Sequence, residues 1–286
     1  MIPFANTDPF MQVEGSLNTI YIIRRTVVSL AFFLFFAFPA AALDYEFIGK
    51  HENGWPKKTR ISGSIQKGDY ERLIAFIRKQ PTSAFIGLAF VELDSTGGNV
   101  AEAMRIASLI KLLYPSIGVV GQCASSCLLL WLSGASRLAT STNRVGIHRP
   151  TLPQEELTSI PLAKLEDNFK KFNETFKEFV LQQGLPMSLY ERLLSTESGD
   201  IYWLSAADLK LIGTSPPYFA EKEKAICGKQ FKQYVASRSE NDMLAYNECY
   251  YAIARRERIA AIDSILGKHF DPQWAVAKQK LMKGNL

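Results

Sequence analysis

The sequence predicts an α/β fold that is followed by a helical C-terminal extension. Three observations lead to this prediction. Strand-like apolar runs alternate with helical patterns between residues 60 and 132, two junctions between them carry Gly-Gly or Gly…Ser turns, and residues 221–286 read as helices alone. Strands joined by helices form right-handed parallel crossovers, so we expect a mostly parallel sheet covered by helices.

Composition places the chain among globular proteins of medium size. Its 286 residues are 47% hydrophobic and 21% charged, and the net charge of +5 is spread thinly. In the lysine-rich stretch 221–232, Glu221 and Glu223 alternate with the lysines. That mixture is typical of a solvated helix face, so we expect no nucleic-acid partner.

Residues 1–42 have the pattern of a targeting segment. Arg24 and Arg25 precede the apolar run 27–38, and Ala40-Ala41-Ala42 offers an A-x-A cleavage site. The run is short for a bilayer span, which needs roughly 20 residues. We expect a mature chain that begins near Leu43 in the periplasm or outside the cell. The alternative is an uncleaved inner-membrane anchor, which would be the chain's only contact with the membrane.

The first elements of the domain are less regular. Residues 45–48 fit a strand, 51–60 a polar loop, and 60–65 a second strand. Asp69 can cap a helix with apolar positions at Leu73, Ile74 and Ile77. The apolar run 85–93 predicts the next strand.

A Gly-Gly turn follows that strand. Gly97 and Gly98 precede apolar residues at helical spacing between Ala101 and Ile110. Glycines at such a junction let the backbone turn sharply and leave bare N–H groups that could stabilise an oxyanion. The alternative is an ordinary helix start.

A serine-containing elbow comes next. Residues 121–126 must turn the chain between a strand at 117–120 and a helix at 128–132. Ser125 at such a turn can act as a nucleophile, and the N–H of Ser126 can serve the oxyanion. Alternatively, the two hydroxyl groups only cap the helix.

His148 is the candidate general base. Of the three histidines (His51, His148 and His269), it alone ends a strand-like run, residues 144–147. An imidazole with a pKa of about 6.5 suits proton transfer at neutral pH. A lone histidine before a proline can also be structural.

Three motifs in this order, LDSTGGNVAEAMRIASLI, GQCASSC and VGIHRP, resemble the Clp protease proteolytic subunit (ClpP) and its crotonase-like superfamily. The resemblance extends from about residue 61 to 213, and within it to exported ClpP-like proteins with a Cys-x-Ser-x-Cys elbow. It implies a repeated β-β-α/βαβ core in a domain of residues 43–220. It further implies the oxyanion turn at Gly97 and Gly98, the nucleophile at Ser125, the second oxyanion donor at Ser126 and the base at His148.

The family's triad aspartate precedes a Phe-Leu-Ser step that opens a helix. Aligning that step with Leu204-Ser205 puts Ile201 at the aspartate position. A shift of one residue brings Asp200 there, which makes Asp200 the candidate that orients His148. The alternative is a loop aspartate without a catalytic role.

Four cysteines in an exported chain predict two disulfides. Cys123 and Cys127 flank Ser125 at positions i and i+4, which is within the usual span of a disulfide. Cys227 and Cys249 would then tie two C-terminal helices together. Two pairs of reduced, buried thiols are the alternative. No histidine or second cysteine pair has ligand spacing, so we expect no metal and no cofactor.

Two helical segments have open roles. Residues 162–183 carry an apolar stripe, which is either core or, as in the handle helix of ClpP, the contact with a neighbouring subunit in a homo-oligomer. The stripe consists of Leu162, Leu165, Phe169, Phe172, Phe176 and Phe179. In the extension, 222–238 and 241–266 predict helices and Trp274 falls in a short tail.

The leading function is a serine peptidase that acts on peptides or unfolded proteins. A catalytically inactive ClpP-fold binding or scaffold protein of the cell envelope is the alternative, because no aspartate aligns. Crotonase chemistry on an acyl-thioester comes third, since export separates the protein from coenzyme A.

Overall fold

The computed structural model describes residues 42–52, 54, 56–139, 144–151, 161–268 and 271–282. Residues 41–286 form one compact unit. The expected targeting segment lies outside the described residues except for Ala42, as do His269 and most of the loop expected at 151–161. No helix in the described part of the chain is both long and apolar enough to cross a membrane.

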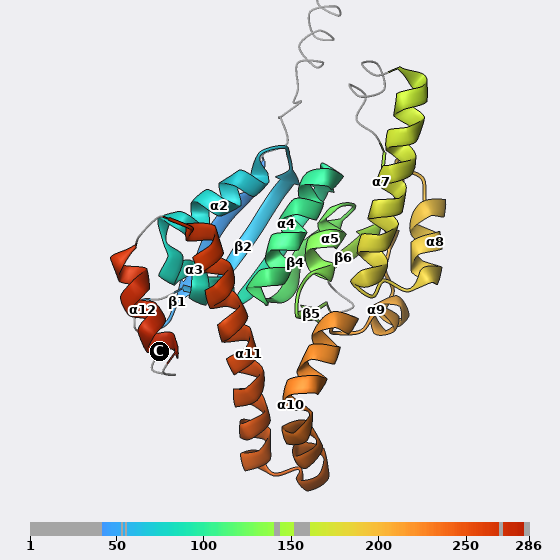
Figure 1. The fold of residues 1–286 in the computed structure, drawn as a ribbon. Helices are drawn as coiled ribbons and strands as arrows, with labels where there is room; N and C mark the ends of the chain where they lie inside the picture. Colours follow the sequence, from blue (N-terminus) through green and yellow to red (C-terminus); the bar gives the residue numbers. More distant parts are fainter. Residues whose placement is uncertain are drawn as a thin grey trace, which may run out of the picture. The chain divides into compact units, whose positions relative to one another are not determined.

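A sheet of seven strands forms the centre of the unit (Figure 1). Six of the strands lie in the order β1-β2-β3-β4-β6-β7, and the seventh, β5, pairs with β4. Strands β2, β3, β4 and β6 are parallel, whereas β1 and β7 add to the edges in antiparallel direction. The strands are β1 (Asp44–Lys50), β2 (Pro56–Ile65), β3 (Phe90–Gly98), β4 (Ser116–Ala124), β5 (Ser136–Leu138), β6 (Arg144–Ile147) and β7 (Tyr202–Trp203).

The described helices lie between the strands and in the C-terminal extension. They are α2 (Asp69–Lys79), α3 (Pro81–Gly87), α4 (Val100–Leu113), α5 (Cys127–Leu132), α7 (Leu162–Gln182), α8 (Met187–Ser195), α9 (Ala206–Ile212), α10 (Pro217–Ser237), α11 (Glu240–Leu266) and α12 (Pro272–Met282). The mixed sheet and the helical C-terminal region confirm the predicted fold class. The domain boundary expected near residue 220 falls inside α10.

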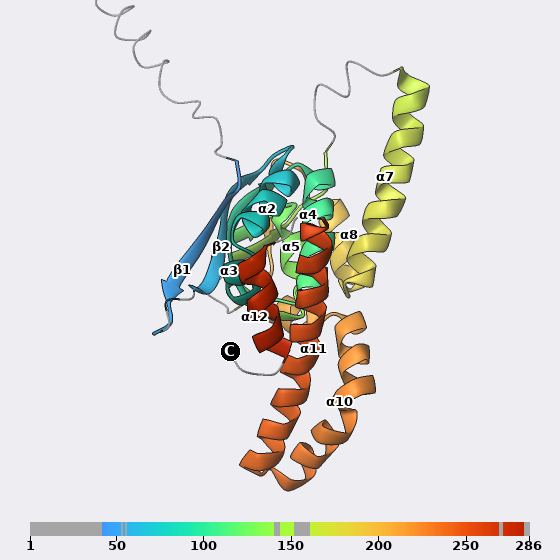
Figure 2. The ribbon, with the colours of Figure 1, turned by 60° about the vertical axis from the view of Figure 1, so that its left-hand side comes forward.

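The sheet and its helices share one apolar core. All six residues of α5 are buried, including Trp131, and Ile61 of β2 and Leu93 of β3 are fully enclosed. Helix α11 contacts α2, α3 and α4, so part of the extension covers the helices of the sheet domain (Figure 2).

Several boundaries differ from the sequence prediction. Residues 85–87 are not strand but the end of α3, because Pro81 occupies the first turn, where its fixed φ and missing N–H favour a helix. Strand β2 begins at Pro56, inside the expected loop, and pairs with β1 from Pro56 to Ser62. Gly68, not Asp69, is the N-cap of α2. Trp274 lies in helix α12 rather than in a tail.

Candidate active site

The Gly-Gly turn lies where β3 ends, directly against the serine elbow. Gly97 and Gly98 have φ values of +89° and +145°, which side chains rarely tolerate. A Cβ on Gly97 would stand 2.6 Å from the carbonyl oxygen of Ala124 and 2.7 Å from the Cβ of Ser125. A Cβ on Gly98 would stand 2.1 Å from the carbonyl oxygen of Ile65. Both positions therefore need glycine for the close approach of three backbone segments.

Ser125 stands at the sharp turn between β4 and α5. Its φ of +57° is in the left-handed region, which is unusual for a residue other than glycine. Its N–H donates to the carbonyl oxygen of Gly146 in β6 at 3.0 Å. Because strain of this kind persists only where the surroundings enforce it and gathers at functional sites, the conformation marks Ser125 as the candidate nucleophile.

The neighbouring serine has a different environment. Ser126 is 4% exposed, and its hydroxyl donates to the carbonyl oxygen of Gly98 at 3.1 Å. Its backbone nitrogen lies 2.9 Å from the place that a Cβ on Gly97 would take. The glycine thus keeps the space beside the elbow free of side-chain atoms, where an oxyanion would have to lie.

The N–H of Gly97 already has an acceptor. It donates to the hydroxyl oxygen of Ser95 at 3.1 Å, and Ser95 is 2% exposed. This N–H can reach an oxyanion only by exchanging the Ser95 hydroxyl for it. Sequence reasoning missed Ser95, although its place two residues before the first glycine could have drawn attention to it.

His148 follows the last residue of β6, the strand that pairs with β4 at Cys123 and Ala124. Its Nδ1 lies 2.9 Å from the carbonyl oxygen of Arg149. A carbonyl only accepts, so Nδ1 carries a proton, and in the neutral ring Nε2 then has the lone pair that a general base needs. The described residues include no hydrogen bond between Ser125 and His148, a contact that often tightens only when substrate binds.

Asp200 lies in the turn before β7 and is exposed. Its N–H donates to the carbonyl oxygen of Glu197 at 3.1 Å. Strand β7 pairs antiparallel with β6 at Ile147 and Tyr202, and one further step of this register puts Ile201 opposite His148. Within the described ranges no hydrogen bond or ion pair joins Asp200 to His148. The orienting role of Asp200 stays a prediction.

Both predicted cysteine pairs lie at disulfide distance. Cys123 and Cys127 have an S–S distance of 2.06 Å and a Cα–Cα distance of 5.2 Å, and both are buried. This bridge spans the elbow and encloses Ser125 between its ends. Cys227 and Cys249 join α10 to α11 with a Cα–Cα distance of 5.8 Å.

Asp94 is a further polar group beside the elbow that sequence reasoning did not single out. One of its carboxylate oxygens accepts from the N–H of Gln122 at 3.2 Å. A Cβ on Gly121 would stand 2.3 Å from that same oxygen. Glycine is therefore needed at this position for the Asp94 carboxylate of β3 to reach the backbone of β4. Within the part of the chain that the structure describes, no group of three or more histidine, cysteine, aspartate or glutamate side chains could hold a metal ion.

The fold and the elbow define a class of α/β protein that carries its site at the carboxyl ends of parallel strands. Residues 61–187 match the family model described as Clp protease, and this range contains the Gly-Gly turn, the elbow and His148. The match supports a ClpP-like peptidase fold for this part of the chain. Asp200 and the helical extension lie beyond it. A comparison with curated proteins finds no significant match.

Proposed function

We propose that this chain is a serine peptidase of ClpP-like fold that hydrolyses peptides or unfolded polypeptides. One observation carries the proposal: Ser125 stands in a left-handed turn that is enclosed by the Cys123–Cys127 bridge and pressed against Gly97. A capping serine needs neither a left-handed backbone nor a glycine packed against its Cβ, whereas a nucleophile at a sharp elbow has use for both.

In the proposed reaction, Ser125 Oγ attacks the peptide carbonyl and His148 Nε2 takes its proton. The same imidazolium then protonates the departing amine, and water releases the acyl group by the reverse route. The N–H groups of Gly97 and Ser126 donate to the oxyanion. To do so, the N–H of Gly97 gives up its hydrogen bond to the Ser95 hydroxyl. The Arg149 carbonyl keeps the imidazole in the required tautomer.

We also propose that the protein acts in the periplasm of a bacterium after removal of the leader. Two disulfides are typical of an oxidising compartment, and they support this location. No ATP-driven unfoldase is expected there, so peptides and loosely folded chains are the accessible substrates.

The proposed partner besides the substrate is a second copy of the chain. Along α7, Phe176 is buried but Phe169 is 39% exposed, so this chain alone does not cover the whole apolar stripe. Leaving such aromatic surface in water is unfavourable, since a fully buried ring contributes roughly 1.5–3 kcal/mol. Contact between two α7 helices would cover the rest.

Fluorophosphonate labelling of the oxidised protein tests the nucleophile. We expect covalent labelling of the native protein, complete loss in Ser125→Ala, and labelling that persists in Ser126→Ala. Ser126 is the matched control because its hydroxyl donates to Gly98 instead of facing a base. Equal loss in both variants would show that the reagent reports elbow folding and not a specific nucleophile.

The second candidate is a binding or scaffold protein that keeps the fold without catalysis. The observation in its favour is that His148 is bonded to a backbone carbonyl and not to a carboxylate. Absence of labelling in the native protein, together with saturable binding of an unfolded polypeptide, would establish this function instead.

A further inference from the structure

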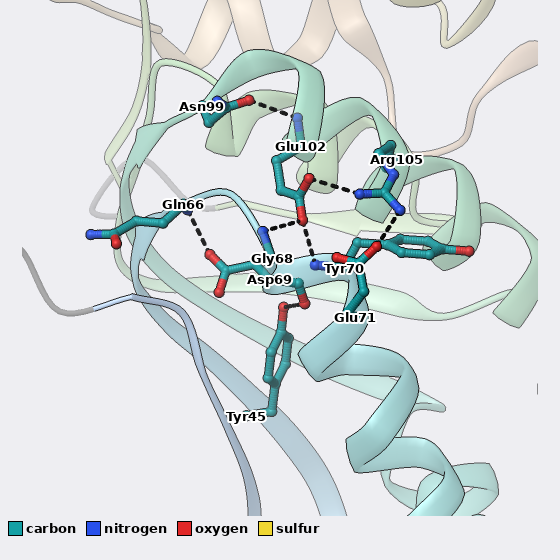
Figure 3. Close-up of polar contacts among 9 residues, drawn as sticks. All are labelled: Tyr45, Gln66, Gly68, Asp69, Tyr70, Glu71, Asn99, Glu102 and Arg105. Carbon is teal, nitrogen blue, oxygen red and sulfur yellow. Dashed lines mark hydrogen bonds and ion pairs between the residues drawn. The ribbon is translucent and has the colours of Figure 1, made fainter.

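Two buried carboxylates lie in the first turns of α2 and α4 (Figure 3). Glu102 is 4% exposed, and its carboxylate accepts from the N–H groups of Gly68 at 3.0 Å and Tyr70 at 2.8 Å. Arg105 donates to it from the solvent side at 3.1 Å. Glu102 therefore has a complete structural role, because it joins the start of α2 to α4.

Asp69 is fully buried, and its carboxylate has three neighbours that can donate: a backbone N–H, a guanidinium group and the backbone nitrogen of Leu43. Its Oδ2 accepts from the N–H of Gln66 at 2.6 Å, and its Oδ1 forms an ion pair with the half-exposed guanidinium of Arg72. The backbone nitrogen of Leu43, just before β1, lies 3.4 Å from Oδ2 in a buried contact. That distance is long for an amide hydrogen bond, which is usually 2.7–3.2 Å.

Leu43 is also the residue that the A-x-A pattern makes the first of the mature chain. Hydrolysis by a signal peptidase breaks the amide bond between Ala42 and Leu43. Water supplies the hydroxyl of the new Ala42 carboxyl group, which then releases its proton to solvent, and it supplies one proton to the Leu43 nitrogen, which takes a further proton from solvent at neutral pH. The neutral amide beside Asp69 would thus become an ammonium group.

We propose that Asp69 is the binding site for the α-ammonium group of Leu43, so that removal of the leader creates a buried ion pair at the start of β1. This inference rests on the proposed export and not on the proposed peptidase activity. Charge-assisted hydrogen bonds are shorter and about twice as strong as neutral ones, so the long 3.4 Å contact would tighten. Arg72 reaches Asp69 from solvent, whereas Leu43 approaches within the core.

The surroundings hold the new terminus in place. Leu43 is 4% exposed and packs in the core, so its nitrogen has little freedom to move away. Two residues later, the hydroxyl of Tyr45 donates to the backbone carbonyl oxygen of Asp69 at 2.9 Å (Figure 3). Between them, Asp44 pairs with Ser62 of β2. The ion pair would therefore fix the free end of an edge strand of the sheet.

The first step of the test is the intact mass of the exported protein, purified from the cell envelope. We expect a chain that begins at Leu43. A chain that begins elsewhere, or keeps its leader, overturns the inference, while the fluorophosphonate experiment judges the peptidase proposal independently.

The second step compares chains that begin at Leu43 or at Ala42, each released from an amino-terminal fusion, with and without Asp69→Asn. We expect the extra alanine to lower the Tm by about 3 °C in the native background, on the order of a 1 kcal/mol loss, and by much less beside Asp69→Asn. Asp44→Asn is the control, because Asp44 is an exposed carboxylate next to the new terminus. In the Asp44→Asn background, the extra alanine should lower the Tm as much as it does in the native background.

Acetylation of the Leu43 amine covers the case in which Asp69→Asn does not fold. It removes the charge and leaves Asp69 intact, so we expect a similar loss of Tm. Unchanged Tm values after both acetylation and the added alanine would overturn the ion pair.

Discussion

At the scale of single residues, the partner of His148 decides how the site would work. The Arg149 carbonyl can fix the tautomer of the ring, but a neutral dipole stabilises an imidazolium less than a carboxylate does. The exposed Asp200 makes no bond to this ring in the described structure. In the proposed mechanism, Ser125 and His148 would therefore act without a carboxylate, and the Arg149 carbonyl would orient the ring.

This geometry predicts a small effect of Asp200→Asn. We expect the fluorophosphonate labelling rate to fall by less than about threefold, whereas loss of a true triad aspartate costs about 10⁴-fold in kcat. His148→Ala is the positive control and should abolish labelling. A drop of a hundredfold or more in Asp200→Asn would mean that the turn before β7 rearranges to bring this carboxylate to His148.

At the scale of elements, the two disulfides are expected to differ in role. The Cys123–Cys127 bridge closes a loop of only four residues, which constrains the unfolded chain by about 2 kcal/mol, yet it holds a serine whose left-handed backbone costs on the order of 1–3 kcal/mol. The Cys227–Cys249 bridge spans 22 residues, and its expected contribution is about 3 kcal/mol.

Removing each bridge separately should therefore give opposite results. In the double variant Cys123→Ala/Cys127→Ala the elbow relaxes, so the labelling rate should fall about tenfold or more. The Tm should change little, because relief of the strained serine backbone offsets the loss of the bridge. The double variant Cys227→Ala/Cys249→Ala should lower the Tm clearly and leave the labelling rate unchanged. Equal labelling in both variants would remove the first bridge from the proposed mechanism.

Helix α7 carries its own prediction. If its partly exposed stripe contacts a second copy, Phe169→Lys should shift the protein to a lower mass in light scattering after size-exclusion chromatography. Asn168→Lys, an exposed neighbour on the same helix, adds the same charge and should leave the mass unchanged. An unchanged mass in both variants would argue against α7 as the interface.

At the scale of the whole unit, Arg258 joins the extension to the sheet domain. This buried guanidinium in α11 donates to the carbonyl oxygens of Leu113 at 2.8 Å, Tyr114 at 3.1 Å and Phe85 at 3.3 Å. Burial lowers its pKa to about 10, so it still carries its charge at neutral pH. A cation at the carboxyl end of α4 also favours the helix dipole.

Truncation of this side chain should destabilise the entire unit. We expect Arg258→Ala to reduce the free energy of unfolding in urea by about 3 kcal/mol, because three carbonyl acceptors lose their donor. Arg256→Ala, on the exposed face of α11, should change it by less than about 0.5 kcal/mol. Equal values for both variants would mean that α11 does not stabilise the sheet domain.

The sequence predicted the strand-helix pattern between residues 60 and 132, except at α3, and the places of the Gly-Gly turn, the elbow and the cysteine pairs. These features depend on local patterns: apolar periodicity, glycines at junctions and cysteines one helical turn apart. The prediction was wrong at residues 85–87. A short apolar run is compatible with a buried strand and with a buried helix, and the proline that starts the helix, Pro81, lies four residues before this run.

Contacts that involve backbone atoms could not be predicted in this way, whether the partners are neighbours or lie far apart along the chain. The bond of His148 to the Arg149 carbonyl and the approach of the Leu43 nitrogen to Asp69 involve backbone atoms, which leave no signature in the sequence. Likewise, nothing local in α11 shows that Arg258 meets the end of α4, 144 residues away along the chain. Such contacts depend on how the elements pack, and packing is a property of the whole unit.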